Sequence, residues 1–116
     1  MPDDPLSSAP PANTANAPRW EPDLIFPVLA DPVRRGLLLA LARDGAAPAA
    51  RLGTAVGRRL DATLKHLVAM RRAGLLVMAP DPADRRRQLY SLSPSVPLAA
   101  TASGRVVDFG FCLLRL

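Results

Sequence analysis

The sequence predicts a mainly helical α+β fold, and three observations support this class. Leu52 and Val56 lie four residues apart just before Gly57, which is typical of a short helix that ends at a glycine. Leucines then recur at helical spacing until a second glycine, Gly74. Two short apolar runs follow, and a Pro- and Asp-rich segment separates them as in a β-hairpin. Helix, turn, helix and basic hairpin, in this order, describe a winged helix-turn-helix.

The size and composition of the chain exclude several classes of protein. A length of 116 residues allows one domain at most. No apolar run is long enough to span a bilayer, and the N-terminus has acids where a secretory signal has bases, so we expect a cytoplasmic protein. One cysteine and one histidine give neither an intramolecular disulfide nor an all-protein zinc site, and no cofactor is expected. The chain has no nucleophile-base pair at motif spacing and no phosphate-binding glycine loop, so we do not expect an enzyme.

Charge is unevenly distributed along the chain. The formal net charge is +5, but residues 1–33 carry one base and five acids, whereas residues 34–116 carry fourteen bases and five acids. The basic excess therefore lies on the helical and hairpin part, which is where we expect a polyanion to bind. Nearly all of the cations are arginine, which suits bidentate contacts to phosphate or guanine. The same arginine content also fits a GC-rich coding sequence.

The N-terminal segment differs in composition from the rest. Residues 1–19 hold five prolines without hydrophobic periodicity, which predicts a disordered tail. Residues 20–94 are expected to form the winged helix-turn-helix domain, and residues 95–116 a C-terminal extension. Trp20 is expected to anchor a short first helix by packing rather than to stack on a base.

Asp31 and Pro32 predict the start of the next helix, with Asp as N-cap and Pro at the first helical position. This helix is expected to end at Arg43. Gly36 within it costs roughly 1 kcal/mol relative to Ala, which a close helix-helix crossing would justify. Gly53, in the following helix, is expected where only a small residue lets two helices approach.

The second helix of the helix-turn-helix admits two registers. If Gly57–Arg59 form the turn, the helix starts near Leu60 and presents Leu60 and Leu64 outward. If Asp61 is the N-cap instead, both leucines pack inward. We prefer the second register because it leaves fewer exposed leucines. Its exposed side would carry Arg58, Arg59, Ala62, Lys65, His66 and Arg72.

The C-terminal extension has the periodicity of a β-strand. Residues 105–116 are predicted to form one strand, with residues 96–101 as its hairpin partner. Such an apolar strand is not left as a bare edge. It pairs either within the domain or across a dimer, and the sequence favours neither. The side chains expected on one face are Val107, Phe109, Phe111 and Leu113.

Four segments resemble winged-helix transcriptional regulators, three of them the ArsR type. Leu29–Arg35 resembles the opening of a helix in the ArsR family, Leu52–Gly57 its first recognition-unit helix, and Thr63–Leu76 its recognition helix with the turn that follows. Asp81–Pro94 is closer to the wing of MarR-type regulators. The match extends over about residues 22–94.

This resemblance implies a homodimer that regulates transcription, most commonly by repression. The recognition helix would enter the major groove, and the wings would lie near the minor groove. Ala46–Ala50 replaces the paired cysteines of metal-sensing members, so no metal effector is expected there. Arg59, Leu60 and Leu64 replace the usual polar residues, so the base-reading set is altered or lost. The strand-like tail replaces the family's C-terminal dimer helix, which leaves the dimer mode open.

We therefore expect a sequence-specific regulator that binds double-stranded DNA, with affinity from phosphate contacts and specificity from the recognition helix. A solvated basic surface is the plainer interpretation of the same cations. The alternative function is a winged-helix module for protein-protein assembly, in which Leu60 and Leu64 form an exposed contact patch. His66 is expected to pack or to bond phosphate rather than to bind metal. The candidate DNA-binding residues are Arg58, Arg59, Ala62, Lys65, His66, Arg85, Arg86 and Arg87.

Overall fold

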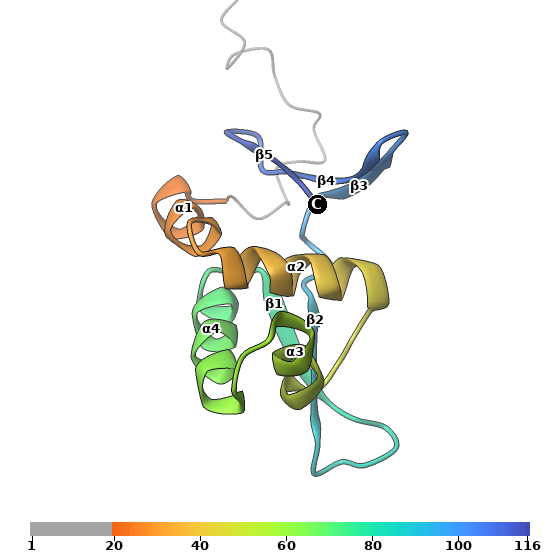
Figure 1. Cartoon of the computed structure of the whole chain (residues 1–116). Helices are drawn as coiled ribbons and strands as arrows, with labels where there is room; N and C mark the ends of the chain where they lie inside the picture. Colours follow the sequence, from red (N-terminus) through yellow and green to blue (C-terminus); the bar gives the residue numbers. More distant parts are fainter. Residues whose placement is uncertain (1–19) are drawn as a thin grey trace, which may run out of the picture.

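A computed structural model describes residues 20–116 as four helices and two small antiparallel sheets. The elements in chain order are α1 (Pro22–Leu29), α2 (Pro32–Asp44), α3 (Ala49–Val56), α4 (Leu60–Arg72), β1 (Leu76–Pro80), β2 (Gln88–Leu92), β3 (Leu98–Thr101), β4 (Gly104–Asp108) and β5 (Leu113–Arg115). Figure 1 shows α2 across the middle, with α1 and the β3–β4–β5 sheet on one side and α3, α4 and the β1–β2 hairpin on the other. The predicted α+β class is confirmed, whereas the predicted tail, residues 1–19, lies outside the described residues.

Helix α2 forms the centre of the core. The carboxylate of Asp31 accepts a hydrogen bond of 2.8 Å from the backbone N–H of Val33, which confirms the predicted N-cap. The helix ends at Gly45, whose positive φ of 82° suits a glycine. Contacts of α2 with α1, α3, α4 and β2 place it at the centre of the packing. Its buried side chains are Leu37, Leu38, Ala40 and Leu41.

Two glycines allow the helices to approach closely. A Cβ at Gly53 would lie 2.9 Å from both the Arg58 carbonyl oxygen and Thr63 Oγ1, so any larger residue forces the backbone or Thr63 to shift. A Cβ at Gly36 would lie 3.3 Å from Val56 Cγ1 on α3. Both expected close crossings are confirmed, and both occur within a single chain.

The preferred register of α4 is wrong. The helix begins at Leu60, with Arg59 as N-cap, and not after Asp61. Leu60 is 51% exposed and Leu64 is 37% exposed. The expectation failed because it counted leucines alone. In the structure the inward row contains a threonine and a methionine in addition to one leucine: Thr63, Leu67 and Met70.

Contacts with the preceding helix fix this register. Gly57 ends α3 in the left-handed conformation, and the N–H of Arg58 donates to the Gly53 carbonyl over 2.9 Å. Thr63 Oγ1 then donates to the Arg59 carbonyl over 2.8 Å, inside the space that Gly53 leaves open. This close contact requires a small polar side chain rather than a leucine at the inward position.

The β1–β2 hairpin is the predicted wing. Its strands pair from Leu76 opposite Leu92 to Pro80 opposite Gln88. Ala47, just before α3, adds a third short segment through two backbone hydrogen bonds with Tyr90, of 3.0 Å and 2.9 Å. The wing is therefore attached to the start of the helix-turn-helix by backbone bonds.

The C-terminal segment is not one strand, so that prediction is wrong. Strand β4 ends at Asp108, and the chain reverses through Gly110, whose φ is 92°, before β5 returns antiparallel to β4. The carboxylate of Asp108 accepts from the Gly110 N–H over 2.9 Å, which stabilises the reversal. Consequently Phe109 is buried whereas Phe111 is 37% exposed, although both were expected on one face.

The predicted hairpin partner is confirmed, because β3 pairs with β4 inside the chain. Trp20 packs edge-to-face on Phe109 with ring centroids 5.4 Å apart, in agreement with a packing role. Val96 and Val107 join the same core as α2. No helix between residues 20 and 116 has the length and apolar character needed to cross a membrane.

Candidate nucleic-acid interface

The outward face of α4 combines an apolar row with a charged row. Leu60, Leu64 and Val68 recur every four residues, and each is more than a third exposed. Asp61 and Lys65 are exposed one position further along the helix. Four-residue spacing places each set on one side of the helix, so the two rows run next to each other.

The turn before α4 presents two arginines to solvent. Arg58 is exposed, and its guanidinium donates to the neighbouring Gly57 carbonyl over 3.1 Å. The side chain of Arg59 is 90% exposed, and its Nε lies 3.7 Å from the Asp61 carboxylate. An exposed pair of this kind contributes little stability. Both guanidiniums therefore remain available to a phosphate.

The wing tip presents three more arginines, each in the turn before β2 begins. Arg86 Nε lies 3.4 Å from the Asp84 carboxylate, and Arg87 Nε lies 3.5 Å from that of Asp81. Within residues 20–116, Arg85 makes no ion pair. The two aspartates also accept backbone N–H bonds from Ala83 and Arg86, which shape the tip. The tip is thus an ordered turn, and its three guanidinium groups differ in how freely they can contact a phosphate.

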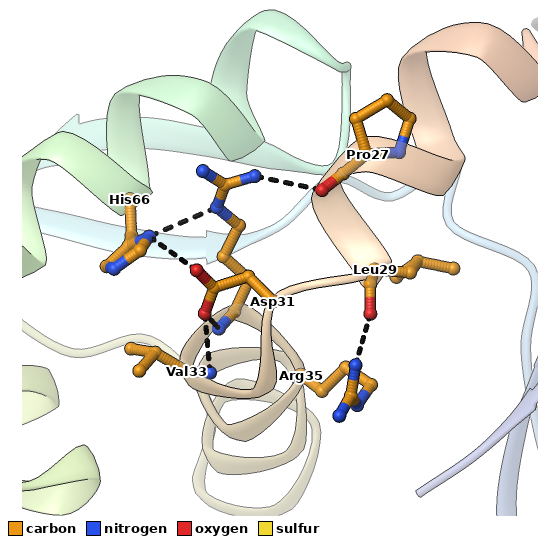
Figure 2. A network of polar contacts seen from close by, with 7 residues as sticks. Pro27, Leu29, Asp31, Val33, Arg35 and His66 are labelled. Atoms are coloured by element: carbon orange, nitrogen blue, oxygen red, sulfur yellow. Dashed lines mark hydrogen bonds and ion pairs between the residues drawn. The ribbon is translucent and has the colours of Figure 1, made fainter.

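His66 does not lie on the exposed face of α4, so the prediction that it belongs to the exposed side of this helix is wrong. Its Nδ1 accepts a hydrogen bond of 3.1 Å from Arg34 Nε and lies 4.0 Å from Asp31 Oδ2 (Figure 2). The His66 side chain is only 20% exposed. With α4 starting at Leu60, this position faces α2 instead of solvent. Ala62 is likewise half-buried.

Two arginines that the sequence reasoning did not select complete this polar network. Arg34 connects three helices, because it also donates to the Pro27 carbonyl at the end of α1 over 3.1 Å. Arg35 donates to the Leu29 carbonyl (Figure 2). The signal in the sequence was the position of both arginines one turn after the N-cap Asp31. Their internal hydrogen bonds make them poor candidates for DNA contact.

The electrostatics of Asp31 follow from its neighbours. Burial by itself would raise its pKa, but the hydrogen bonds from the backbone N–H groups of Val33 and Arg34, together with the positive charge of the Arg34 guanidinium, lower it below the ordinary value of 3.8. The ionised carboxylate is therefore favoured in the folded protein and stabilises it.

We expect Asp31→Ala to lower the free energy of unfolding by about 0.5–2 kcal/mol at neutral pH, through loss of the N-cap. Asp31→Asn keeps a cap acceptor and should cost less. Since the folded-state pKa is lowered, the stabilisation by the charge is present above 3.8 and is lost as the pH falls through the folded value. Urea unfolding of the wild type and Asp31→Asn should therefore differ at neutral pH and converge in acid. A difference that is independent of pH would contradict this role of the charge.

The structure brings some of the predicted site residues to one end of the molecule and separates others. The start of α4 and the wing tip both lie at the end opposite the β3–β4–β5 sheet (Figure 1). Arg58, Arg59 and Lys65 are exposed on the helix-turn-helix, and the loop of the β1–β2 hairpin, whose sequence includes Arg85, Arg86 and Arg87, projects from the same end of the molecule. Residues 20–116 bring together no three His, Cys, Asp or Glu side chains that could hold a metal ion.

Comparison with known proteins supports this geometry. No family model and no curated protein matches the chain. Among solved structures, the ArsR family transcriptional regulator RHA00566 is 27% identical, with a TM-score of 0.52 over 61% of this chain and 69% of that chain. A probable transcriptional regulator from Pseudomonas aeruginosa is 26% identical, with a TM-score of 0.55 over 63% and 58%. The MarR family transcription regulator SP03579 is 25% identical, with a TM-score of 0.53 over 63% and 50%.

The chain has the winged-helix fold of ArsR- and MarR-type regulators. The resemblance found in the sequence is thereby confirmed. This winged-helix chain spans only about half the length of several of the solved structures that it matches, with 50%, 58% and 55% of the first three covered. In such a fold α4 corresponds to the recognition helix, and the β1–β2 hairpin to the wing.

Proposed function

We propose that this winged-helix chain is a sequence-specific DNA-binding transcriptional regulator, acting by binding rather than catalysis. The observation that supports this most directly is the arrangement of α4 and the wing, which project exposed cations from one end of the molecule. A helix of this size fits the major groove, and a hairpin tip can reach the adjacent backbone or minor groove. Arg58, Arg59, Lys65 and the wing arginines would bind phosphates.

We also propose that the regulator is a homodimer and a repressor. The surface opposite the DNA-binding end supports dimerisation, because it exposes apolar side chains from α1 and the C-terminal sheet. Leu24, Phe26 and Leu113 are each more than half exposed, and Phe26 packs edge-to-face on Phe111 with centroids 5.2 Å apart. A dimer through this surface would leave α4 and the wing free for two half-sites. Repression would follow if bound dimers exclude the transcription machinery.

One observation favours a second candidate, a module for protein-protein assembly. Leu60, Leu64 and Val68 form an exposed apolar row on the very helix that would enter the groove. An exposed apolar row can pack in a partner's hydrophobic groove. The two functions differ in salt dependence, since apolar contacts are much less sensitive to ionic strength than phosphate contacts.

The test is fluorescence-anisotropy binding of the full chain to a random duplex of about 30 base pairs, titrated from low to physiological salt. We expect the logarithm of the affinity to fall linearly with the logarithm of salt, by about 0.9 for each phosphate neutralised. Arg58→Ala with Arg59→Ala should lower the magnitude of this slope by about 1–2, because two exposed phosphate ligands are removed.

The matched control removes two positive charges from the C-terminal sheet, which lies on the other side of α2 from the helix-turn-helix. Arg105 and Arg115 lie on β4 and β5, and both are exposed. Their double alanine variant has the same net charge as the Arg58/Arg59 variant and should keep the wild-type slope. Absence of binding to any duplex at low salt would reject the regulator and leave the assembly module. Equal slopes in the two variants would reject the assigned surface.

A further inference from the structure

The exposed apolar row of α4 is unusual for a helix that reads DNA. Leu60 is 51% exposed, Leu64 37% and Val68 41%, although the same helix buries Leu67 and Met70 completely. The core is therefore complete without the outer row. Since the register of α4 is fixed by the contact between Gly53 and Thr63, rotation of the helix cannot bury these side chains.

The hydrogen-bonding capacity of this face is small. Next to the apolar row, only Asp61 and Lys65 are exposed in the first half of α4. A leucine pressed against the polar edge of a base would remove water from donors and acceptors without replacing their hydrogen bonds, which is unfavourable. In the major groove, the C5-methyl group of thymine is the apolar feature that a leucine can cover without this penalty.

We propose that Leu60 and Leu64 determine sequence specificity by contacting C5-methyl groups of pyrimidines in the major groove. This inference rests on the proposed function. Residues four apart in a helix are separated by about 6 Å along its axis. Base pairs are about 3.4 Å apart, so the two leucines meet methyl groups about two steps apart. The sites that are bound best therefore contain thymines at this spacing.

The charges around the row favour DNA over an apolar protein partner. Arg58, Arg59 and Lys65 are exposed beside the two leucines, and the wing at the same end of the molecule carries three more arginines. Ordinary apolar interfaces exclude charge from their centre. A groove lined with phosphates on both sides matches an apolar row with a cationic border.

The experiment uses duplexes that differ only in this methyl group. The full chain is titrated by anisotropy with an alternating dA–dT duplex and with the same duplex in which deoxyuridine replaces thymidine. Every position of an alternating duplex repeats the same edges, so the operator need not be known. Phosphates and Watson–Crick pairing are identical in the two duplexes. A second pair compares alternating dG–dC with its 5-methylcytosine form, which adds the methyl group to another base pair.

We expect the uridine duplex to bind about fourfold more weakly for each methyl group that is lost from contact. The 5-methylcytosine duplex should bind more tightly than its parent for the same reason. Leu60→Ala with Leu64→Ala should abolish both differences while the salt slope stays unchanged. Both side chains are exposed, so the variant should fold, which circular dichroism and thermal unfolding check.

Leu98→Ala is the matched control, because Leu98 is 38% exposed and belongs to β3, which lies on the side of α2 opposite α4 and the wing (Figure 1). It should keep the methyl discrimination. Equal wild-type affinity for thymine and uracil duplexes, with normal salt dependence, would overturn this inference and leave the proposed function intact. Retained discrimination in the Leu60/Leu64 variant would also overturn it. Failure to bind any duplex would overturn both, and would turn the apolar row into evidence for protein assembly.

Discussion

Leu67→Ala is expected to lower the free energy of unfolding by about 2–5 kcal/mol, whereas Leu64→Ala should lower it by less than about 1 kcal/mol. The substitution is chemically identical and the two positions are three residues apart on α4. Leu67 is completely buried in the hydrophobic core, and its truncation leaves a cavity there. Leu64 is 37% exposed, and its truncation mainly shortens a solvent-facing side chain.

Urea unfolding monitored by circular dichroism measures both differences. The comparison also tests the register of α4 in solution. If the helix began after an Asp61 N-cap, Leu64 would pack inward and its truncation would be the costly one. Similar losses at the two positions, or a larger loss at Leu64, would contradict the register described above. Thr63→Val offers an independent check, because it removes the 2.8 Å hydrogen bond to the Arg59 carbonyl and keeps the side-chain shape.

Replacing Arg85, Arg86 and Arg87 together by alanine is expected to give the largest loss of DNA affinity. Each arginine that binds a phosphate contributes about 0.9 to the slope of log affinity against log salt. The loss should be less than three full contacts, because Asp84 and Asp81 already neutralise two of the guanidiniums in part. We therefore expect the slope to fall in magnitude by about 1–2, and the affinity to fall most at low salt.

A single substitution at the wing tip is expected to change the DNA affinity in the opposite direction. Asp84→Asn keeps an oxygen that can accept the Arg86 backbone N–H, but it removes the negative charge 3.4 Å from the Arg86 guanidinium. It should increase both the affinity and the salt slope. Wild-type slopes in the triple variant, together with no gain in Asp84→Asn, would show that the wing does not touch DNA. Since the tip is exposed, neither change should alter the unfolding curve by more than about 0.5 kcal/mol.

Among the candidate DNA-binding residues, exposure was predicted correctly for those in the turn and wrongly for two of those on α4, and one physical reason explains the difference. Arg58 and Arg59 lie in a turn that glycine and sequence spacing define locally, so their exposure was predictable. Ala62 and His66 lie on a helix, where each residue of register rotates a side chain by about 100°. An error of one or two residues at the start of α4 therefore moved His66 from solvent to the Asp31 carboxylate.

The C-terminal segment shows the same limit for strands. Alternation of apolar residues indicated β-structure correctly, and residues 98–101 are the hairpin partner that was expected. Alternation does not reveal a reversal, because a strand that turns back through Gly110 keeps the same local pattern. The chain turns back between β4 and β5, which places Phe111 in the reversal and leaves Phe111 and Leu113 exposed.

The sequence by itself determined the local features of this protein: the Asp31 N-cap, the glycines that end helices, the basic hairpin and the order of elements. These depend on side chains within a few residues of each other, whose preferences are readable without the fold. Tertiary structure alone decided which face of α4 is outward. The close approach of the two helices at Gly53, where the Thr63 side chain fits, fixes that face. Packing between the helices outweighs the tendency of two leucines to be buried.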